Sequence, residues 1–214
     1  GYYPKGGGEV HLKITPIKQL TAVEVLNRGT IRGINGWTYV AGSVSLNEAY
    51  QMSNTVKDTV IRKFHQNSIR VPPINIEPYR EDRGMVVGHG SGINIVCVTD
   101  CCVYGGSGLG LRKRDAIGPG QEAAIKICEP IIENSCVDQH MQDQLIILMA
   151  LAMGKSKIAL GSQKITQHTE TAIQVAEIML KEKGLDFRVH NGIEGDATGT
   201  FIECQGCGLV NSAY

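Results

Sequence analysis

Apolar and polar residues alternate in several short stretches of the chain, and this period of two is typical of half-buried β-strands. Glu9–Ile17 is the first such stretch, and Pro16 indicates that its strand ends there or lies at a sheet edge. Eight further strands are predicted: Leu20–Leu26, Thr38–Val44, Ile74–Tyr79, Ile93–Thr99, Cys101–Tyr104, Ile158–Leu160, Phe187–Val189 and Thr200–Glu203. Ile93–Thr99 and Cys101–Tyr104 are close enough in the chain to form a hairpin.

Apolar residues at helical spacing occupy the segments between many of these strands. Leu46–His65 has this spacing, and the Pro72-Pro73 pair that follows breaks the helix. Three further helices are predicted: Gln121–Asn134, Asp138–Met153 and Thr169–Lys183, the last two each followed by a glycine. Because strand pairs lie between helices, the pattern favours an α+β fold over a doubly wound parallel sheet.

Composition narrows the class of protein. The chain has 214 residues, with 21 Lys and Arg against 21 Asp and Glu, which is enough for one large domain or two small ones. No apolar run approaches the roughly 18–20 residues that span a bilayer, so we expect no membrane protein. The balanced charge argues against a strongly basic nucleic-acid coat but leaves room for a local basic groove.

The seven cysteines and the first residue complete this picture. An odd number of cysteines, with no secretory signal ahead of them, indicates reduced thiols and an intracellular protein. The chain opens at Gly1, inside a Gly-rich turn. We therefore expect the sequence to be part of a longer protein.

Three small motifs have ordinary structural explanations. Gly6-Gly7-Gly8 is expected to be a turn into the first strand. Gly105–Gly110 lacks both the dinucleotide-binding pattern and the Gly-Lys-Ser/Thr of a phosphate loop, so a structural turn is predicted. Cys204 and Cys207 have the spacing of half a zinc site, but no second pair completes four ligands. Incidental thiols are the favoured interpretation, and a thiol or zinc module is the alternative.

Two residues near the C-terminus are candidates for chemistry. Asp143 lies in a very apolar helix, where a charge is seldom buried without a partner. It therefore either lies on an exposed stripe or faces a site. His168 lies where the next helix begins, and such a terminus attracts phosphate. Its imidazole is either a cap or packing group, or a nucleophile toward phosphorus with the helix end stabilising the negative charge.

Several stretches taken together resemble the RNA 3'-terminal phosphate cyclase family. The resemblance runs over essentially the whole chain and is carried by a glycine-rich signature, a nucleotide-binding helix, a histidine segment, a hairpin region and a C-terminal strand: Gly1–Val10, Asp138–Leu145, Gln167–Ile173, Gly92–Gly118 and Phe201–Gly206. The last of these resembles animal members of the family. Each stretch alone is weak, and their combination is specific.

The resemblance implies an ATP-dependent ligase that converts an RNA 3'-phosphate to a 2',3'-cyclic phosphate. His168 would be the catalytic nucleophile that forms a His–AMP intermediate. Asp143 and Gln144 match residues that contact the nucleotide, and His140 stands where the family usually has a tyrosine that stacks on adenine. The family uses a divalent metal ion, Mg²⁺ or Mn²⁺, whose ligands cannot be assigned here. The partners implied are ATP and an RNA 3'-phosphate end, and the location implied is the nucleus, with the cytoplasm as the alternative.

The resemblance also implies a domain organisation. Family members are longer and are built from repeated βαβαββ units with a smaller inserted α/β domain. Residues 1–28 and 131–214 would form part of the cyclase domain, and 29–130 the insert. Arginines that bind the RNA phosphate would lie upstream, so this chain alone is expected to be poorly active. The alternative within the family is a non-catalytic cyclase-like protein of ribosome biogenesis, which lacks the histidine pattern.

Overall fold

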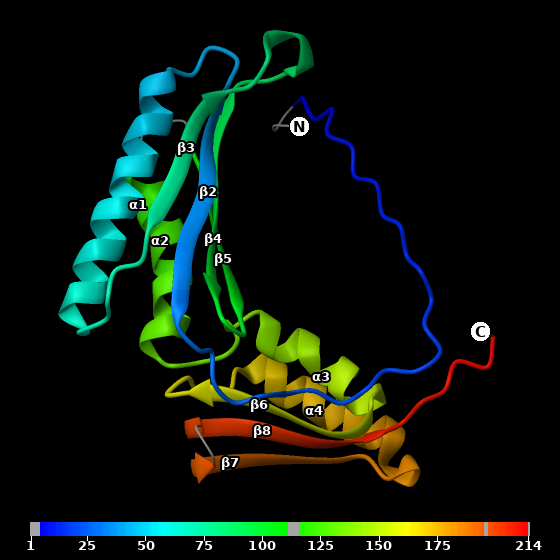
Figure 1. Ribbon diagram of the computed structural model, residues 1–214. Coiled ribbons are helices and arrows are strands. Elements are labelled where there is room, and N and C mark those ends of the chain that lie inside the picture. Colours follow the sequence, from blue (N-terminus) through cyan, green and yellow to red (C-terminus); the bar gives the residue numbers. More distant parts are fainter. Residues whose placement is uncertain (1–4, 111–115, 195–196, 214) are drawn as a thin grey trace. The chain divides into compact units, whose positions relative to one another are not determined.

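Two compact units, each with its own sheet, make up the computed structural model of the chain (Figure 1). The structure describes residues 5–110, 116–194 and 197–213. Unit 1 consists of Gly1–Leu12 and Thr30–Ile132, and unit 2 consists of Lys13–Gly29 and Glu133–Tyr214. Each unit contains both helices and strands, which confirms the α+β fold class.

Unit 1 is a four-stranded sheet with two helices on one face (Figure 1). Its elements in chain order are β2 (Ile31–Ala41), α1 (Leu46–Gln66), β3 (Ile74–Arg80), the 3₁₀ turn η1 (Arg83–Met85), β4 (Gly90–Thr99), β5 (Val103–Leu109) and α2 (Ile117–Ile132). The strand order is β3-β2-β4-β5, with β2 and β3 parallel and the other neighbours antiparallel. The predicted hairpin is therefore the β4–β5 pair.

Helix α1 shows how the sequence pattern forms the core of unit 1. Ser45 caps its N-terminus, because the serine hydroxyl accepts a hydrogen bond from the backbone N–H of Asn47 at 3.3 Å. Its apolar stripe is fully buried and is formed by Ala49, Met52, Val56, Val60 and Phe64. The sheet presents Ile34, Ile93 and other buried residues from its inward face.

The predicted strand Glu9–Ile17 is wrong. Residues 9–17 form no strand, and their apolar side chains are exposed, with Val10 at 92% and Leu12 at 81%. The following prediction, Leu20–Leu26, is reduced to β1 (Glu24–Val25). An alternating pattern stabilises a strand only when a neighbouring strand accepts its hydrogen bonds and a core accepts its apolar side chains.

The predicted turn at Gly105–Gly110 is also wrong, because most of this segment belongs to β5. Gly106 and Gly108 lie on the buried face of the strand, against the backbone of α2. A Cβ atom on Gly106 would lie 2.3 Å from the carbonyl oxygen of Ala123, and one on Gly108 would lie 2.4 Å from that of Pro119. These glycines allow a helix to approach the strand closely.

Unit 2 is a second four-stranded sheet, again with two helices on one face (Figure 1). After β1 its elements are α3 (Met141–Leu151), β6 (Met153–Gly161), α4 (Gln167–Leu180), the 3₁₀ turn η2 (Lys181–Lys183), β7 (Asp186–Glu194) and β8 (Ala197–Cys207). The strand order is β1-β6-β8-β7, with β1 and β6 parallel and the other neighbours antiparallel. Helix α3 is shorter, and β6 longer, than the sequence pattern predicts.

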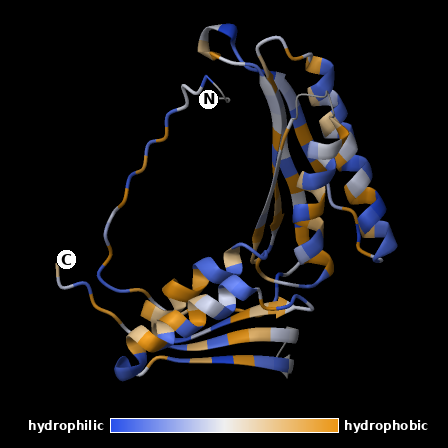
Figure 2. Cartoon of the chain, turned by 180° about the vertical axis from the view of Figure 1, so that it is seen from behind, coloured by the Kyte–Doolittle hydropathy of each residue, from blue (hydrophilic) through white to orange (hydrophobic). Residues whose placement is uncertain are grey.

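The core of unit 2 lies between its sheet and the two helices. Ile146 and Met149 of α3, Leu160 of β6 and Ile202 of β8 are almost completely buried there. Hydrophobic residues are frequent along both helices (Figure 2). Several of them are exposed rather than buried: Ile147, Leu148, Val175, Ile178 and Met179.

The division into two units does not test which part of the chain is the cyclase domain and which part is the insert. The assignment of residues 1–28 and 131–214 to a cyclase domain, and of 29–130 to an insert, stays a prediction. Each unit has its own sheet, helices and core, whatever role it has in the whole protein.

Candidate functional site

A pocket in unit 2 brings together all four residues that the sequence singles out. It has a volume of about 400 Å³ and is lined by Gln139, His140, Asp143, Gln144, Thr166 and His168. The candidates come from the start of α3 and the start of α4, which lie far apart in the sequence. The fold is therefore what makes them neighbours.

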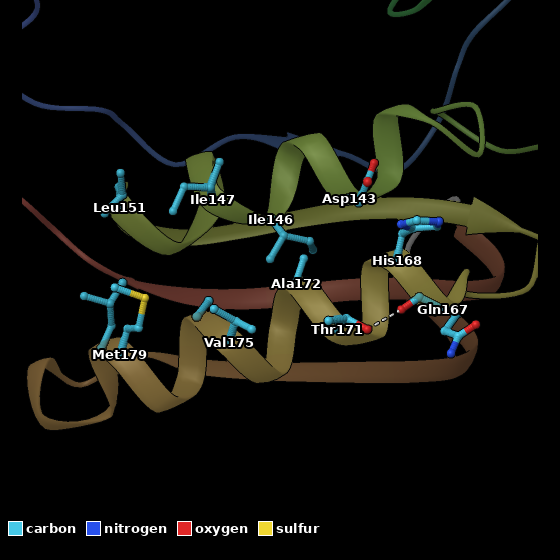
Figure 3. A pocket seen from close by; sticks show the side chains of 12 residues that line it. Asp143, Ile146, Ile147, Leu151, Gln167, His168, Thr171, Ala172, Val175 and Met179 are labelled. Atoms are coloured by element: carbon cyan, nitrogen blue, oxygen red, sulfur yellow. Dashed lines mark hydrogen bonds between the residues drawn. The ribbon is translucent and has the colours of Figure 1, made fainter.

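Strand β6 explains why the two helix starts meet. It follows α3 in the sequence and returns the chain to the end of the sheet where α3 began. Helix α4 therefore begins at the same end (Figure 3). Asp143 and His168 lie together at that end in the figure. The N-terminus of a helix carries a partial positive charge and backbone N–H groups that the helix itself does not use. The N-terminus of α4 is the part of the pocket suited to an anion such as phosphate, because a carboxylate, that of Asp138, already accepts from backbone N–H groups at the start of α3.

Helix α4 presents His168 in its first turn. Thr166 is the N-cap, and its hydroxyl accepts a hydrogen bond from the backbone N–H of Thr169 at 3.2 Å. His168 is exposed, whereas the next residue, Thr169, is completely buried. The imidazole is therefore accessible to a ligand on a well-anchored backbone.

The turn ahead of α3 is held by a carboxylate. One oxygen of Asp138 accepts hydrogen bonds from the backbone N–H groups of His140 at 2.9 Å and Met141 at 2.8 Å. His140 is exposed, and Asp143, in the first turn, is half-buried. Because Asp143 lines the same pocket as His168, the structure favours the interpretation in which this carboxylate faces a site.

An amide that the sequence does not single out connects the two helices. Gln142 is 2% exposed. Its Oε1 accepts hydrogen bonds from the N–H of Thr166 and the hydroxyl of Thr169, both at 3.2 Å. Its Nε2 donates to Oε1 of Gln163 at 2.8 Å. Only the rotation of α3 decides which residue of the polar Gln-Asp-Gln run points inward, and nothing in the local pattern fixes that rotation.

A longer apolar groove begins at the same place. It has a volume of about 820 Å³ and runs between α3 and α4 (Figure 3). Asp143 and His168 line one end of it, and the rest is mainly aliphatic, including Ile147, Leu151, Val175 and Met179. Polar chemistry is therefore confined to the end where the two helices begin.

The donor set of the pocket limits how it can hold a metal ion. Among the described residues, no group of three His, Cys, Asp or Glu side chains lies close enough to bind one. Asp143 is the carboxylate in the pocket lining. Mg²⁺ is commonly held by one or two carboxylates together with substrate phosphates and water. The residues present fit an ion that arrives with a nucleotide.

The cysteines do not support the thiol or zinc alternative. Cys204 is completely buried, and burial raises the pKa of its thiol to about 12. Cys207 lies three positions further along β8, so the two side chains point to opposite faces of the sheet. Cys101, between β4 and β5, is exposed, while Cys97, Cys102, Cys128 and Cys136 are buried.

Comparison with known proteins gives one consistent result. The sequence pattern of the RNA 3'-terminal phosphate cyclase family matches residues 1–184. The chain is 35% identical over 212 residues to the RNA 3'-terminal phosphate cyclase of Drosophila melanogaster, covering 99% of this chain and 55% of the relative. It is 34% identical over 211 residues to that of Staphylothermus marinus, covering 98% of this chain and 56% of the relative. A probable cyclase of Dictyostelium discoideum is 32% identical over 213 residues, covering 96% of this chain and 46% of the relative.

An α+β fold in which two histidines, an aspartate and a glutamine meet at two helix N-termini is the class of protein that these observations define. Within that class, the chain belongs to the RNA 3'-terminal phosphate cyclase family. It spans about half the length of the curated relatives it matches. In the part of the chain that the structure describes, every helix is too short or too polar to cross a membrane.

Proposed function

We propose that this chain carries the nucleotide-binding pocket of an ATP-dependent RNA 3'-terminal phosphate cyclase, an enzyme of the ligase type. The observation that carries the proposal is the exposed imidazole of His168 in a pocket formed by two helix N-termini. The relatives' names supply the reaction, and the pocket supplies a nucleophile beside an anion-binding surface.

The first step transfers AMP to the protein. A ring nitrogen of His168 attacks the α-phosphorus of ATP and forms an N–P bond, while the bond from that phosphorus to the bridging oxygen breaks. Pyrophosphate leaves with the electron pair. The N-terminus of α4 stabilises the negative charge that builds up on the phosphoryl oxygens.

The remaining steps use AMP as a leaving group. An oxygen of the RNA 3'-phosphate attacks the phosphorus of the bound AMP, and the N–P bond breaks to release the histidine. The neighbouring 2'-hydroxyl then attacks the 3'-phosphorus, loses its proton to a base or to solvent, and displaces AMP. A phosphate monoester lacks a good leaving group, so covalent activation divides a difficult reaction into feasible steps.

The other pocket residues have positions suited to holding the nucleotide. His140 presents an aromatic face that stacks on adenine with less area than a tyrosine ring. Gln144 supplies an amide for hydrogen bonds. Asp143 is the carboxylate available to a Mg²⁺ or Mn²⁺ ion, which would offset phosphate charge when bound. The rest of the ion's coordination would come from phosphate oxygens and water.

The rival within the family is a non-catalytic cyclase-like protein acting in ribosome biogenesis. The presence of His168 together with Asp143 and Gln144 in one pocket favours the enzyme. A protein without this chemistry has no need for an accessible imidazole at the helix start.

The test is covalent labelling of the full-length protein with ATP radiolabelled at the α-phosphate. The wild-type protein is expected to gain an acid-labile, base-stable label, and His168→Ala to lose essentially all of it, because the attacking nitrogen is gone. His65→Ala, which removes an exposed histidine at the end of α1, is the matched control and should label like wild type. Equal labelling of His168→Ala and wild type would show that the nucleophile is assigned wrongly.

A further inference from the structure

Gln142 is an unusual residue for the position it occupies. It lies on the buried side of α3, where a leucine would be the ordinary choice, and is 2% exposed. Burying an amide is unfavourable unless its donors and its acceptor are all satisfied. Here both ends are used: Oε1 accepts two hydrogen bonds, and Nε2 donates to Gln163 at 2.8 Å and to the carbonyl of Lys164 at 3.4 Å.

The partners of Gln142 lie on both sides of His168 in the sequence. Thr166 is two residues before the histidine and Thr169 is one residue after it. The two threonine hydroxyls are also within 2.9 Å of each other. Gln142 therefore holds the first turn of α4 through one backbone group, the N–H of Thr166, and one side chain, the hydroxyl of Thr169, and His168 lies between them.

The network continues behind Gln142 into the loop that precedes α3. The hydroxyl of Ser135, which is completely buried, donates to the carbonyl of Val137 at 2.6 Å and lies 3.4 Å from Oε1 of Gln163. Gln163 is itself 8% exposed. The loop between β6 and α4 is thus fixed by buried amides and hydroxyls, which hold their partners in specific directions.

Gln142 is also the immediate neighbour of Asp143 in α3. One residue of that pair reaches into the network that holds α4, and the other lines the pocket with His168. We propose that Gln142 is a positioning residue, which sets the distance and direction of His168 relative to Asp143 and to the α-phosphorus of bound ATP. The inference rests on the proposed function of His168 as the AMP acceptor.

The chemistry of the position explains why a glutamine is needed. A leucine would leave the N–H of Thr166 without its acceptor and would free the hydroxyl of Thr169 to bond only with that of Thr166. A glutamate could accept both bonds, but would place a carboxylate oxygen against the acceptors on Gln163 and Lys164. Only an amide of this length accepts at one end and donates at the other.

The experiment measures the rate of His168 labelling by α-labelled ATP in the full-length protein. For Gln142→Leu and Thr169→Val, the rate at saturating ATP should fall by roughly 10- to 100-fold, since small displacements of reacting groups have effects of that size. The ATP concentration at half-maximal rate should change little, because neither side chain lines the pocket. Thr169→Ser keeps the hydroxyl and should recover most of the rate.

Thr38→Val is the matched control for Thr169→Val. Both threonines are completely buried, and the hydroxyl of Thr38 donates one hydrogen bond, to the carbonyl of Ala49 at 2.8 Å in unit 1. Thr38→Val therefore loses this bond, and Thr169→Val loses the hydroxyl contacts with Gln142 and Thr166, which are the ones next to the histidine. A general loss of stability would lower the labelled fraction in both variants and leave the rate per labelled site unchanged.

The outcomes separate this inference from the function on which it rests. If wild type labels and Thr169→Val labels at the wild-type rate, the positioning role is overturned while the nucleophile assignment stands. If wild type does not label, both are overturned. Should Gln142→Leu fail to fold, the comparison of Thr169→Val with Thr169→Ser and Thr38→Val decides the question alone.

Discussion

Glu203 shows how a single carboxylate makes the sheet of unit 2 sensitive to pH. It lies on β8 opposite two lysines of β6, with Lys155 Nζ at 3.0 Å and Lys157 Nζ at 3.5 Å from its oxygens. The hydrogen bond from Lys155, followed by the charges of both lysines, holds the pKa of Glu203 below its ordinary value of 4.5. The ionised form is therefore favoured by folding.

The sign of the pH effect follows from this direction. The stabilisation is complete above the ordinary pKa and is lost as the pH falls through the lowered folded value. We expect Glu203→Gln to reduce the free energy of unfolding by about 0.5–1 kcal/mol at neutral pH. The difference from wild type should vanish well below pH 4.5, the ordinary value. Urea unfolding at neutral and acidic pH measures this difference.

The control for this prediction is Glu182→Gln, which changes an exposed glutamate of η2. It should show the same dependence on pH as wild type. A difference between Glu203→Gln and wild type that persists unchanged at acidic pH would mean that the side chain acts through its packing rather than its charge.

At the residue scale, the sequence predicts the candidate catalytic and ligand-binding residues better than the residues that hold them in position. His168 stands out because a helix start with an imidazole suggests phosphate chemistry, and Asp143 because a charge in an apolar helix needs an explanation. Gln142 does not stand out, because a neutral amide beside a charge looks like part of a polar stripe. Its role depends on four residues of another helix and the loop before it, which the local pattern does not contain.

At the scale of an element, the close contact between strand β5 and helix α2 can be tested with a single substitution. Gly106→Ala should reduce the free energy of unfolding of unit 1 by about 1–3 kcal/mol, the usual range for overpacking. The reason is that the new methyl group would lie 2.3 Å from the carbonyl oxygen of Ala123, so α2 would have to move away. Denaturant unfolding monitored by circular dichroism measures the change.

Gly105→Ala is the neighbouring control. Gly105 is exposed on the other face of the strand, and a Cβ atom there would meet no atom within 4 Å. Its effect should stay within about 0.5 kcal/mol. Equal losses for the two variants would imply that glycine is needed for the strand's backbone and not for its contact with α2.

The sequence predicts an element well when the residues of that element alone determine its conformation. Leu46–His65 differs from α1 by a single residue, because a long apolar stripe and a serine cap define it locally. Glu9–Ile17 has a clear strand pattern and forms no strand. Gly105–Gly110 has the composition of a turn and is mostly strand, because its conformation is set by α2 rather than by its own residues.

The two units should respond separately to core substitutions. Leu160→Ala, in the fully buried core of unit 2, should reduce stability by about 2–5 kcal/mol. Amide hydrogen exchange should become faster in α3, α4 and β6–β8 and should change little in α1 and β2–β5. This expectation follows from the separate cores of the units.

Val56→Ala in α1 is the reciprocal variant, because Val56 is fully buried in unit 1. It should make amide hydrogen exchange faster in unit 1 and leave the amide hydrogen exchange of unit 2 nearly unchanged. If each variant loosens both units to the same extent, the chain unfolds as one cooperative body and the two units are not independent in stability.

At the scale of the whole molecule, the family could be predicted from the sequence and the geometry of the pocket could not. Combined motifs from Gly1 to the C-terminal strand carry the resemblance, and the comparisons confirm it. The meeting of His140 with His168 depends on β6 returning the chain between two helices. The spacing of residues along the sequence does not show that the chain returns in this way.

The uneven burial of the cysteines has a practical consequence. Thiol reagents attack the accessible thiolate, so Cys101 should be modified first, and Cys128 and Cys204, whose burial raises the pKa of their thiols, last. A maleimide dye would thus attach mainly to the tip of the β4–β5 hairpin without any engineering of the chain. Fluorescence from that position would report on unit 1, whereas the pocket with His168 belongs to unit 2.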